Sequence, residues 1–261
     1  WHCSENNQGA YSKMSQAEAI YALWLREFKV FTREKSRIVS SIFTPMLWIF
    51  VFGGGLGSAI NIGNVNYQIF IYPGILVMSV LFSSVFFGVY IIWDRKIDIL
   101  KAILVAPLSR TTIFVGKVLG GCTDSMIQAL IMLLVSFVLG IYLTVSSFLL
   151  AIIILFLLAL SLVSTGLIIG SLMESPEGFN MIISFLIFPL FFFSGALFPI
   201  DNLPIWLSFI TYINPVTYGV DALRMAILGV SQFPLYVDLI VLTGFAVVMF
   251  TIGTRTFERM K

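Results

Sequence analysis

The chain has 261 residues, of which 59% are hydrophobic and 11% are charged, and its formal net charge is +2. Soluble domains carry about 25% charged residues, so this chain cannot cover itself with a polar surface. The composition excludes a disordered chain, a coiled coil and a disulfide-rich secreted domain, and the small net charge gives no sign of nucleic acid as a partner. We therefore predict an all-α membrane protein with several spans in a lipid bilayer.

The first segment, residues 1–13, is polar and lacks the apolar region of a signal peptide. We expect it to be a polar tail or a cloning remnant, with Met14 as the natural start.

Residues 14–37 predict an amphipathic helix. The apolar face holds Ile20, Leu23, Trp24, Phe28 and Phe31, and the basic face holds Arg26, Lys29 and Arg33. Glu27 and Glu34 fall on the apolar side, so the pattern is imperfect. The basic face and Trp24 favour a helix on the cytoplasmic membrane surface over an ordinary solvated helix.

Residues 38–261 predict a domain of six transmembrane helices, because a span needs about 20 apolar residues. The apolar stretches are about 38–60, 69–93, 112–142, 148–173, 181–198 and 235–254. The outer segment 199–234 holds four prolines, which break helices. It predicts a hairpin of two short re-entrant helices, at about 203–213 and 216–228, that do not cross the membrane.

The distribution of basic residues sets the orientation. With six spans, 14 of the 15 Lys and Arg residues lie on the side of the two termini, if Lys117 is counted with the connection before it. Only Arg224 lies on the other side. This asymmetry predicts that both termini face the cytoplasm. A seventh span through 205–228 would bury Asp221 and reverse the C-terminus, so we reject it.

Polar residues inside the predicted third span are Lys117, Asp124 and Gln128. An ionisable group at this depth is costly, so Asp124 is a candidate proton or ion site. We favour the structural alternative, in which Lys117 or a neighbouring helix satisfies Asp124. Asp221 and Arg224 lie three residues apart on one predicted helix, a spacing that allows them to pair locally.

Glycines four residues apart recur in the predicted spans and permit close helix contact. The pairs are Gly53 and Gly57, Gly116 and Gly120, and Gly166 and Gly170.

Catalytic and metal-binding patterns are scarce. The single histidine is His2 and the two cysteines are Cys3 and Cys122, which excludes His-based catalysis in the membrane and gives no metal site. The sequence has no P-loop motif, so any ATP that drives the protein is hydrolysed by another chain. We therefore do not expect an enzyme.

The cytoplasmic loop 94–111 predicts a short amphipathic helix that ends at Pro107. Its apolar side holds Ile97, Leu100, Ile103 and Leu104. Such a helix can dock into a groove of a soluble partner, or it can lie on lipid.

Three segments resemble ABC-2-type transporter permeases, most closely the branch that exports drugs, nodulation factors or polysaccharides. They are Asp94-Arg-Lys with Leu100-Lys-Ala-Ile-Leu-Val-Ala-Pro107-Leu-Ser-Arg110 and Gly116-Lys117, then Pro189-Leu-Phe-Phe-Phe-Ser-Gly195-Ala-Leu-Phe-Pro199, then Ile213-Asn-Pro215-Val-Thr-Tyr218-Gly-Val-Asp221-Ala-Leu-Arg224. The likeness runs from Met14 to the end of the chain. One departure is Ile97-Asp98-Ile99, where such loops usually have an acidic start and a Gly before the Leu.

The resemblance implies a dimer with a second copy or a homologue, and two cytoplasmic ABC ATPase subunits that bind ATP and Mg. This chain itself is expected to bind no cofactor and no metal. The residues implied in coupling to the ATPase are Arg26, Arg33, Asp94, Arg95, Asp98, Leu100, Lys101, Leu104 and Pro107. Those implied in the translocation path are Phe43, Trp48, Phe52, Phe82, Phe86, Phe188 and Phe192. Those implied in the outer gate are Asn214, Pro215, Tyr218, Asp221 and Arg224.

The predicted function is the permease subunit of an exporter in the plasma (inner) membrane of a prokaryote. Its expected substrate is amphiphilic, lipid-linked or glycosylated, with a polysaccharide conduit as one form and a drug exporter as another. The alternative from a different class is an ATP-independent ion-coupled carrier or channel that uses Asp124. Carriers often show an internal repeat, and this sequence shows none.

Overall fold

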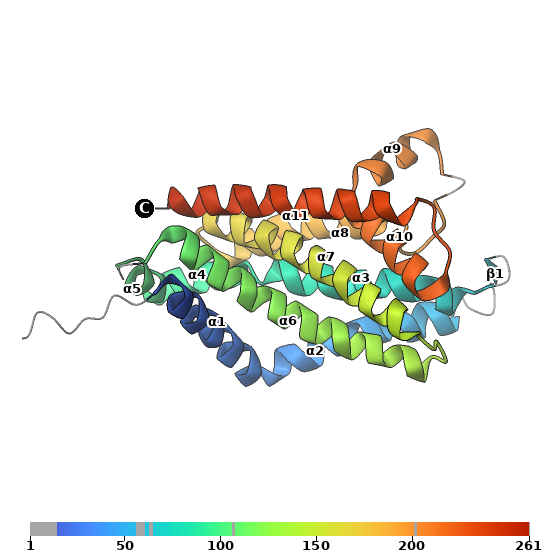
Figure 1. Cartoon of the computed structure of the whole chain (residues 1–261), viewed down its shortest axis with the longest axis horizontal. Helices are drawn as coiled ribbons and strands as arrows, with labels where there is room; N and C mark the ends of the chain where they lie inside the picture. The colour runs from blue at the N-terminus through green and yellow to red at the C-terminus, as the bar shows by residue number, and fades with distance from the viewer. Residues whose placement is uncertain (1–14, 56–60, 63–64, 106–107, 201–202, 261) are drawn as a thin grey trace, which may run out of the picture.

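The computed structural model describes residues 15–55, 61–62, 65–105, 108–200 and 203–260 (Figure 1). Within these ranges the chain forms eleven α-helices, one π-helical segment and a ribbon of two very short strands. The predicted tail 1–13, Met14 and Pro107 lie outside the described residues. The all-α prediction is confirmed.

The N-terminal helix α1 (Gln16–Arg33) begins with a capping box, in which Ser15 and Glu18 satisfy each other's backbone amides. It is followed by α2 (Lys35–Trp48) and the π-helical segment η1 (Ile49–Gly54). The chain bends by 67° between α1 and the segment Ile38–Gly54, so α1 does not simply extend the next helix. Strands β1 (Asn61–Ile62) and β2 (Val65–Asn66) then pair antiparallel.

The central helix α3 (Tyr67–Phe86) is apolar and buried on nearly every side, as expected of a helix at the core of a membrane bundle. After a break at Phe87 and Gly88, the chain continues as α4 (Val89–Lys96) and α5 (Ile99–Val105). Two long helices follow: α6 (Arg110–Val138), capped by Ser109, and α7 (Val145–Leu172), capped by Thr144.

The C-terminal third starts with α8 (Pro176–Phe192), which has Ser175 as its N-cap. The short helices α9 (Ile205–Ile213) and α10 (Pro215–Leu228) match the two predicted ones within two residues at each end. The last helix is α11 (Leu235–Glu258). The third predicted span, at about 112–142, extends too far at its C-terminal end. Its helix ends at Val138 because the chain turns at Gly140, which has a φ of +75°.

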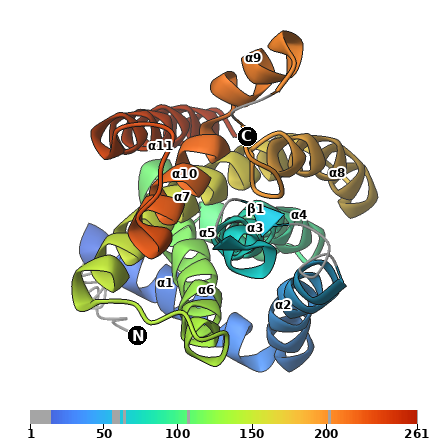
Figure 2. The same ribbon diagram turned by 90° about the vertical axis from the view of Figure 1, so that its right-hand side faces the viewer.

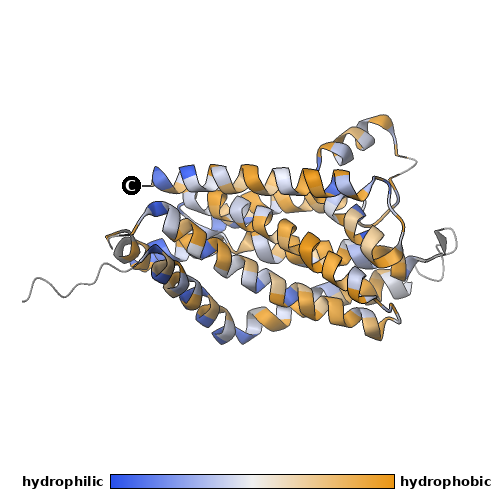
Figure 3. Ribbon diagram, in the orientation of Figure 1, coloured by the Kyte–Doolittle hydropathy of each residue, from blue (hydrophilic) through white to orange (hydrophobic). Residues whose placement is uncertain are grey.

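The long helices run side by side, with α1, α5 and the end of α11 at one end of the bundle (Figure 1). The opposite end carries β1, α9 and α10. The view along the bundle shows α3 in the centre, with α2 and α8 on two sides of it and α6 and α7 on others (Figure 2). Hydrophilic residues gather along α1 and at the C-terminal end of α11, whereas the middle of the bundle is apolar (Figure 3).

Four helices are long and apolar enough to cross a membrane: Tyr67–Lys96, Arg110–Val138, Val145–Leu172 and Leu235–Glu258. The bent pair Gln16–Arg33 and Ile38–Gly54 can supply a fifth, and α8 is a shorter apolar helix. The structure is therefore that of a membrane protein with several spans. The number of six spans stays a prediction.

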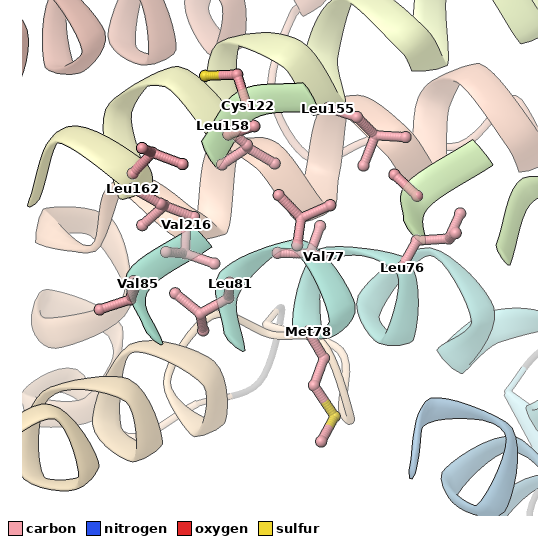
Figure 4. Packing of buried hydrophobic residues seen from close by; sticks show 14 of the residues in the cluster. Leu76, Val77, Met78, Leu81, Val85, Cys122, Leu155, Leu158, Leu162 and Val216 are labelled. Atoms are coloured by element: carbon pink, nitrogen blue, oxygen red, sulfur yellow. The ribbon is translucent and has the colours of Figure 1, made fainter. Parts of the chain in front are cut away.

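Glycines allow the closest contact in the core, where α7 crosses the junction of α3 and α4. A Cβ added to Gly166 would lie 2.3 Å from the carbonyl oxygen of Val85, and one added to Gly170 would lie 2.2 Å from that of Gly88. The predicted packing role of this glycine pair is confirmed. Leucines of α7, including Leu155, Leu158 and Leu162, pack over α3 beside these crossings (Figure 4).

We predict that Gly166→Ala lowers stability, by about 1 to 3 kcal/mol, because backbone atoms cannot move aside as a side chain can. Thermal unfolding in mild detergent measures the effect. Gly244→Ala is the matched control, because a Cβ on Gly244 of α11 meets nothing within 4 Å. Equal melting temperatures for the two variants would contradict the proposed backbone contact.

Candidate functional site

Four charged side chains from three helices meet at the end of the bundle that carries α5. Lys117 Nζ of α6 lies 3.0 Å from Glu27 Oε1 of α1 and 2.6 Å from Asp94 Oδ2 of α4. Arg26 Nη1 donates to Glu27 Oε1 at 2.7 Å and to Asp94 Oδ2 at 3.1 Å, and its Nη2 donates to Asp94 Oδ1. We call these four residues the ionic cluster.

The ionic cluster is neutral and largely hidden from solvent. Lys117 is 0% exposed, and Glu27 and Asp94 are 4% exposed each. Burying a charge is tolerated only when it is paired and hydrogen-bonded, and each charge here has at least two partners. Burial lowers the pKa of Arg26, but the hydrogen bond to Asp94 and the charges of Glu27 and Asp94 outweigh this and raise the pKa above its usual value. Arg26 therefore stays positive.

Glycines on α6 let α1 approach closely enough to form the ionic cluster. A Cβ on Gly116 would lie 2.7 Å from the Cβ of Leu23, and one on Gly120 would lie 2.5 Å from the Cβ of Glu27. Trp24 adds a hydrogen bond of 2.9 Å from its Nε1 to Thr123 Oγ1. The α1 helix is thus packed on α6 through its apolar face, and its location on the membrane surface stays a prediction.

The two glutamates on the apolar side of the predicted helix, Glu27 and Glu34, both bind side chains of other helices. Glu27 belongs to the ionic cluster, and Glu34 accepts a hydrogen bond from Tyr90 of α4. Lys117 was expected as a partner of Asp124, and the structure places it with Glu27 and Asp94 instead. Asp124 accepts from Gln128 Nε2 at 2.5 Å on its own helix, and both residues are buried.

Arg95 extends the connections to α7. Its guanidinium donates to the carbonyl oxygens of Ser171 at 2.9 Å and of Met173 at 3.0 Å. Carbonyls in the last turn of a helix lack partners within it, so Arg95 caps α7. Through Asp94 and Arg95, the α4 helix is joined to α1, α6 and α7.

The predicted coupling helix is broken in two. The chain bends between α4 and α5 at Asp98, whose φ is +56°. As a result Ile97 is 59% exposed whereas Leu100 is 2% exposed, so these two do not share one side as predicted. Asp98 occupies the left-handed conformation that Gly adopts at no cost, at the point where resembling loops usually have Gly. The side chains of Lys101 and Leu104 lie outside the described residues, and Arg33 is exposed.

Aromatic residues of the predicted path form one continuous row. Trp48 stacks on Phe52 with ring centroids 4.7 Å apart and meets Phe191 edge-on at 6.0 Å. The row continues by contacts of 5.5 to 6.3 Å between the rings of Phe191, Phe192, Phe188, Phe82 and Phe86. It joins α2 and η1 to α8 and α3. Phe191 was missed by sequence, and Phe43, 59% exposed, lies on the outer face of α2.

At the opposite end, the polar residues of the third motif join separate segments. Asn214 caps α10 by accepting from the Val216 amide at 3.0 Å, and its Nδ2 donates to the Leu190 carbonyl at the end of α8. Pro215 takes the first position of α10, where its missing N–H costs nothing. Tyr218 donates to the Tyr212 carbonyl of α9 at 2.8 Å.

Asp221 and Arg224 complete this arrangement with partners other than each other. Asp221 accepts from the backbone amides of Gln232 and Phe233 at 2.9 to 3.0 Å. Arg224 donates to the Gly195 carbonyl at 3.0 Å and lies over the ring of Phe70, 4.2 Å from its centroid. The local pair that the spacing allows is therefore not what these hydrogen bonds show, because each side chain binds backbone groups of another segment.

Among the described residues, no three His, Cys, Asp or Glu side chains come together to hold a metal ion. The described side chains thus form the ionic cluster at one end of the bundle, hydrogen bonds to backbone groups at the other end, and the aromatic row.

Comparison with known proteins gives a consistent match. The model of the ABC-2 type transporter family matches residues 18–228. A putative transport permease, ycf38, of Cyanophora paradoxa is 32% identical over 229 residues, which are 85% of this chain and 79% of the relative. The inner membrane transport permease YadH of Escherichia coli K12 is 27% identical over 249 residues (92% and 95%). Nodulation protein J of Rhizobium leguminosarum bv. viciae is 25% identical over 242 residues (91% and 93%).

We predict that Lys117→Met destabilises the protein strongly, by about 3 to 5 kcal/mol, because it leaves Glu27 and Asp94 without the buried cation. The double variant Lys117→Met/Glu27→Gln should lose less than the sum of the single variants. Thermal unfolding of all three tests this coupling. Lys96→Met is the control, because Lys96 is exposed. Strict additivity would contradict the ionic cluster.

We also predict that Asp98→Gly raises stability, by about 1 kcal/mol, because Gly relieves the left-handed backbone of a residue with a Cβ. Asp98→Val, with a β-branched side chain, should lower it. Melting temperatures of the two variants give the signs. A lower melting temperature for Asp98→Gly would contradict the idea that the left-handed backbone at position 98 destabilises the protein.

Proposed function

This chain belongs to the ABC-2 type transporter family, and on that premise we propose that it is the permease subunit of an exporter that uses ATP hydrolysed by separate cytoplasmic subunits. The observation that carries the proposal is the family match over residues 18–228, because that range includes both α1 and the α4–α5 loop. ATP and Mg would bind to the partner subunits, and this chain would supply the path and the coupling surface.

Six spans with both termini in the cytoplasm are part of the proposal. Four helices have the length and hydropathy of spans. The segment Ile38–Gly54 has 17 residues, as does α8, and 17 residues correspond to about 26 Å at 1.5 Å per residue, close to the thickness of the bilayer core. On this topology 14 of 15 basic residues face the cytoplasm.

Force from the ATPase would enter at the α4–α5 loop and at α1. The ionic cluster supports this, because Asp94 and Lys117 link α1, α4 and α6, and Arg95 links α4 to α7. Asp94 itself is buried, so we assign it the transmission of movement and assign contact with the ATPase to exposed residues such as Ile97 and Arg33. A push on one element would then move several spans together, as alternating access requires.

The substrate would move along the side of the bundle where α2 and α8 flank α3, against a second copy of the chain or a homologue. The row of seven rings from Trp48 to Phe86 supports this, because it offers a long apolar surface within the membrane. Such a surface suits an amphiphile. A relative is named for nodulation and others for permease activity, which is compatible with an exported amphiphilic, lipid-linked or glycosylated molecule.

Purification of the chain from its native membrane in gentle detergent tests the proposal. We expect a soluble P-loop ATPase to co-purify in stoichiometric amount, as mass spectrometry would show. Recovery of the intact, active chain without an ATPase would overturn the exporter and favour the ion-coupled carrier. In that case pH-dependent flux abolished by Asp124→Asn is the expected result.

We predict that the double reversal Asp98→Lys/Lys101→Glu reduces substrate-stimulated ATP hydrolysis of the purified complex at least fivefold without loss of the inserted chain. The reason is that it inverts the charge pattern of the loop that faces the ATPase and leaves the net charge unchanged. Glu258→Arg/Arg259→Glu at the end of α11 is the matched control. Unchanged coupling in the loop variant would refute the assignment of the loop.

A further inference from the structure

The first turn of α11 contains a carboxyl group that is buried without a partner. The Asp238 side chain is 0% exposed, and both of its carboxyl oxygens are buried with no hydrogen-bond partner among the described residues. Glu177, the acid in the first turn of α8, is by contrast exposed. A carboxylate that is buried, unpaired and not hydrogen-bonded is so costly that such a group takes up a proton instead. The position of Asp238 therefore favours the neutral acid.

A second carboxyl group, that of Asp221 on α10, lies within electrostatic range of Asp238. Asp221 accepts hydrogen bonds of 2.9 to 3.0 Å from the backbone amides of Gln232 and Phe233, just before α11 begins. Hydrogen bonds from amides and the N-terminus of a helix both favour the ionised form of a carboxyl group. Asp221 is therefore the group that carries the charge, and a second negative charge beside it is disfavoured.

The titratable side chains of α9 and α10 near Asp238 are bound to other groups. Tyr218 of α10 lies within electrostatic range of Asp238, but its hydroxyl donates to the carbonyl of another tyrosine, Tyr212 of α9. The cation of α10, Arg224, donates to the Gly195 carbonyl. Neither donor of α10 therefore forms a hydrogen bond with Asp238.

The long helices beside α11 bring no charge to this end of the bundle. The α7 helix packs along α11 and contains no titratable side chain. The last charged residue of α6 is Asp124, and the part of α6 beyond it, which runs towards the α10 end, is uncharged (Figure 1). On α11 itself, the next charged residue after Asp238 is Arg255, near the other end, and Tyr236 in the first turn is exposed. Asp221 is thus the charge that acts on Asp238 among the described residues.

The segment between α10 and α11 ties three helices together. The ring centroid of Phe233 lies 5.3 Å from that of Tyr218 on α10 and 5.8 Å from that of Tyr212 on α9. The backbone amide of Phe233, like that of Gln232, is bound by Asp221. The two carboxyl groups therefore lie where α9, α10 and α11 are joined, at the end of the bundle opposite the ionic cluster (Figure 1).

We propose that Asp238 is a proton-binding site, and that the bound proton keeps α10 joined to α11. With the proton in place, a neutral acid packs beside the Asp221 carboxylate. When the O–H bond of Asp238 breaks and the proton passes to water, two negative charges repel each other in a buried place. The hydrogen bonds of Asp221 to the segment before α11 then open more readily, which loosens the connection between the two helices.

A proton needs no cavity, so the burial of Asp238 does not prevent its exchange. Local opening of the segment before α11 admits water, because Val230, Gln232 and Pro234 in that segment are exposed. On the proposed topology this end of the bundle faces the outside of the cell, so external acid tightens the connection and external alkali loosens it. The proton site does not rest on the exporter function, because it follows from the packing of α10 and α11.

Infrared spectroscopy of the full chain in phosphatidylcholine nanodiscs tests the proton. The C=O stretch of a protonated carboxyl group is separate from the bands of a carboxylate, and the difference between wild type and Asp238→Asn isolates the signal of Asp238. We expect a protonated-acid band at about pH 5 that disappears towards about pH 9, within the range in which buried carboxyl groups titrate. Glu177→Gln, which removes an exposed first-turn acid, is the matched control and should keep this band. No difference between wild type and Asp238→Asn at any pH would overturn the proposal.

Asp221→Asn tests the influence of the neighbouring charge, because asparagine keeps an acceptor oxygen for the amides but is neutral. Without that charge Asp238 should release its proton more easily, so the midpoint of its infrared band should move to a proton concentration about tenfold higher or more. Glu177→Gln should keep the wild-type midpoint. An unchanged midpoint in Asp221→Asn would contradict the interaction between the two carboxyl groups.

Hydrogen exchange at the backbone amides of Gln232 and Phe233 tests the loosening. Wild type and Asp238→Asn are compared at the same pH, which cancels the chemical effect of pH on exchange. We expect equal rates at about pH 5, and exchange at least fivefold faster in wild type than in Asp238→Asn at about pH 9. The Gly178 amide, which donates to Ser175 at the start of α8, is the internal control and should exchange equally in both proteins. Equal exchange of Gln232 and Phe233 at both pH values would overturn the proposed effect of the proton on the α10–α11 connection.

Discussion

The buried amino group of Lys117 is the feature on which the arrangement of helices at the α5 end of the bundle depends. A lysine at 0% exposure needs anions, and it obtains one from α1 and one from α4. That requirement fixes the position of α1, which apolar contacts alone would leave free to slide along α6. It also fixes the position of α4, which directly precedes α5, relative to α6. Because removal of one partner would leave a buried charge unpaired, we expect the contacts of the ionic cluster to be energetically coupled.

The opposite end of the bundle is held by a different kind of bond. There Asn214, Asp221 and Arg224 bind backbone groups of the α8 end and of the α10–α11 loop. Every residue has a backbone carbonyl and nearly every residue has a backbone N–H, so a hydrogen bond to the backbone does not require a particular partner residue. One short motif can therefore hold several connecting segments whatever their sequences. Between the two ends, glycines bring α3, α4 and α7 together through van der Waals contact. The charged side chains described here thus hold the two ends of the bundle, and close van der Waals packing of glycines joins the helices between them.

Much of the fold could be predicted because membrane helices are determined by length and hydropathy, which are local. The short helices α9 and α10 were predicted from prolines, and α1 from its periodicity. The partners of charged residues could not be predicted, because they come from helices far apart in sequence. The sequence suggested Lys117 as a partner of Asp124 because both lie on the same helix, two turns apart. The fold instead brings Glu27 of α1 within 3.0 Å of the Lys117 amino group. The glutamate on the apolar face of α1 was the available signal, since a buried charge there requires a cation from elsewhere.

Asp124 and Gln128 form a buried polar pair within the long helix α6. Gln128 Nε2 donates to Asp124 Oδ1 at 2.5 Å, one turn away on the same helix. A leucine at position 128 would remove this donor from the carboxylate, and a glutamate would set two carboxylates four residues apart on one buried helix face. Glutamine has nearly the shape of glutamate but carries an NH2 group, so it can donate a hydrogen bond to the carboxylate. The cost of burying Asp124 is therefore offset in part by a neighbour four residues along the sequence, which is a pairing that helix geometry alone makes possible.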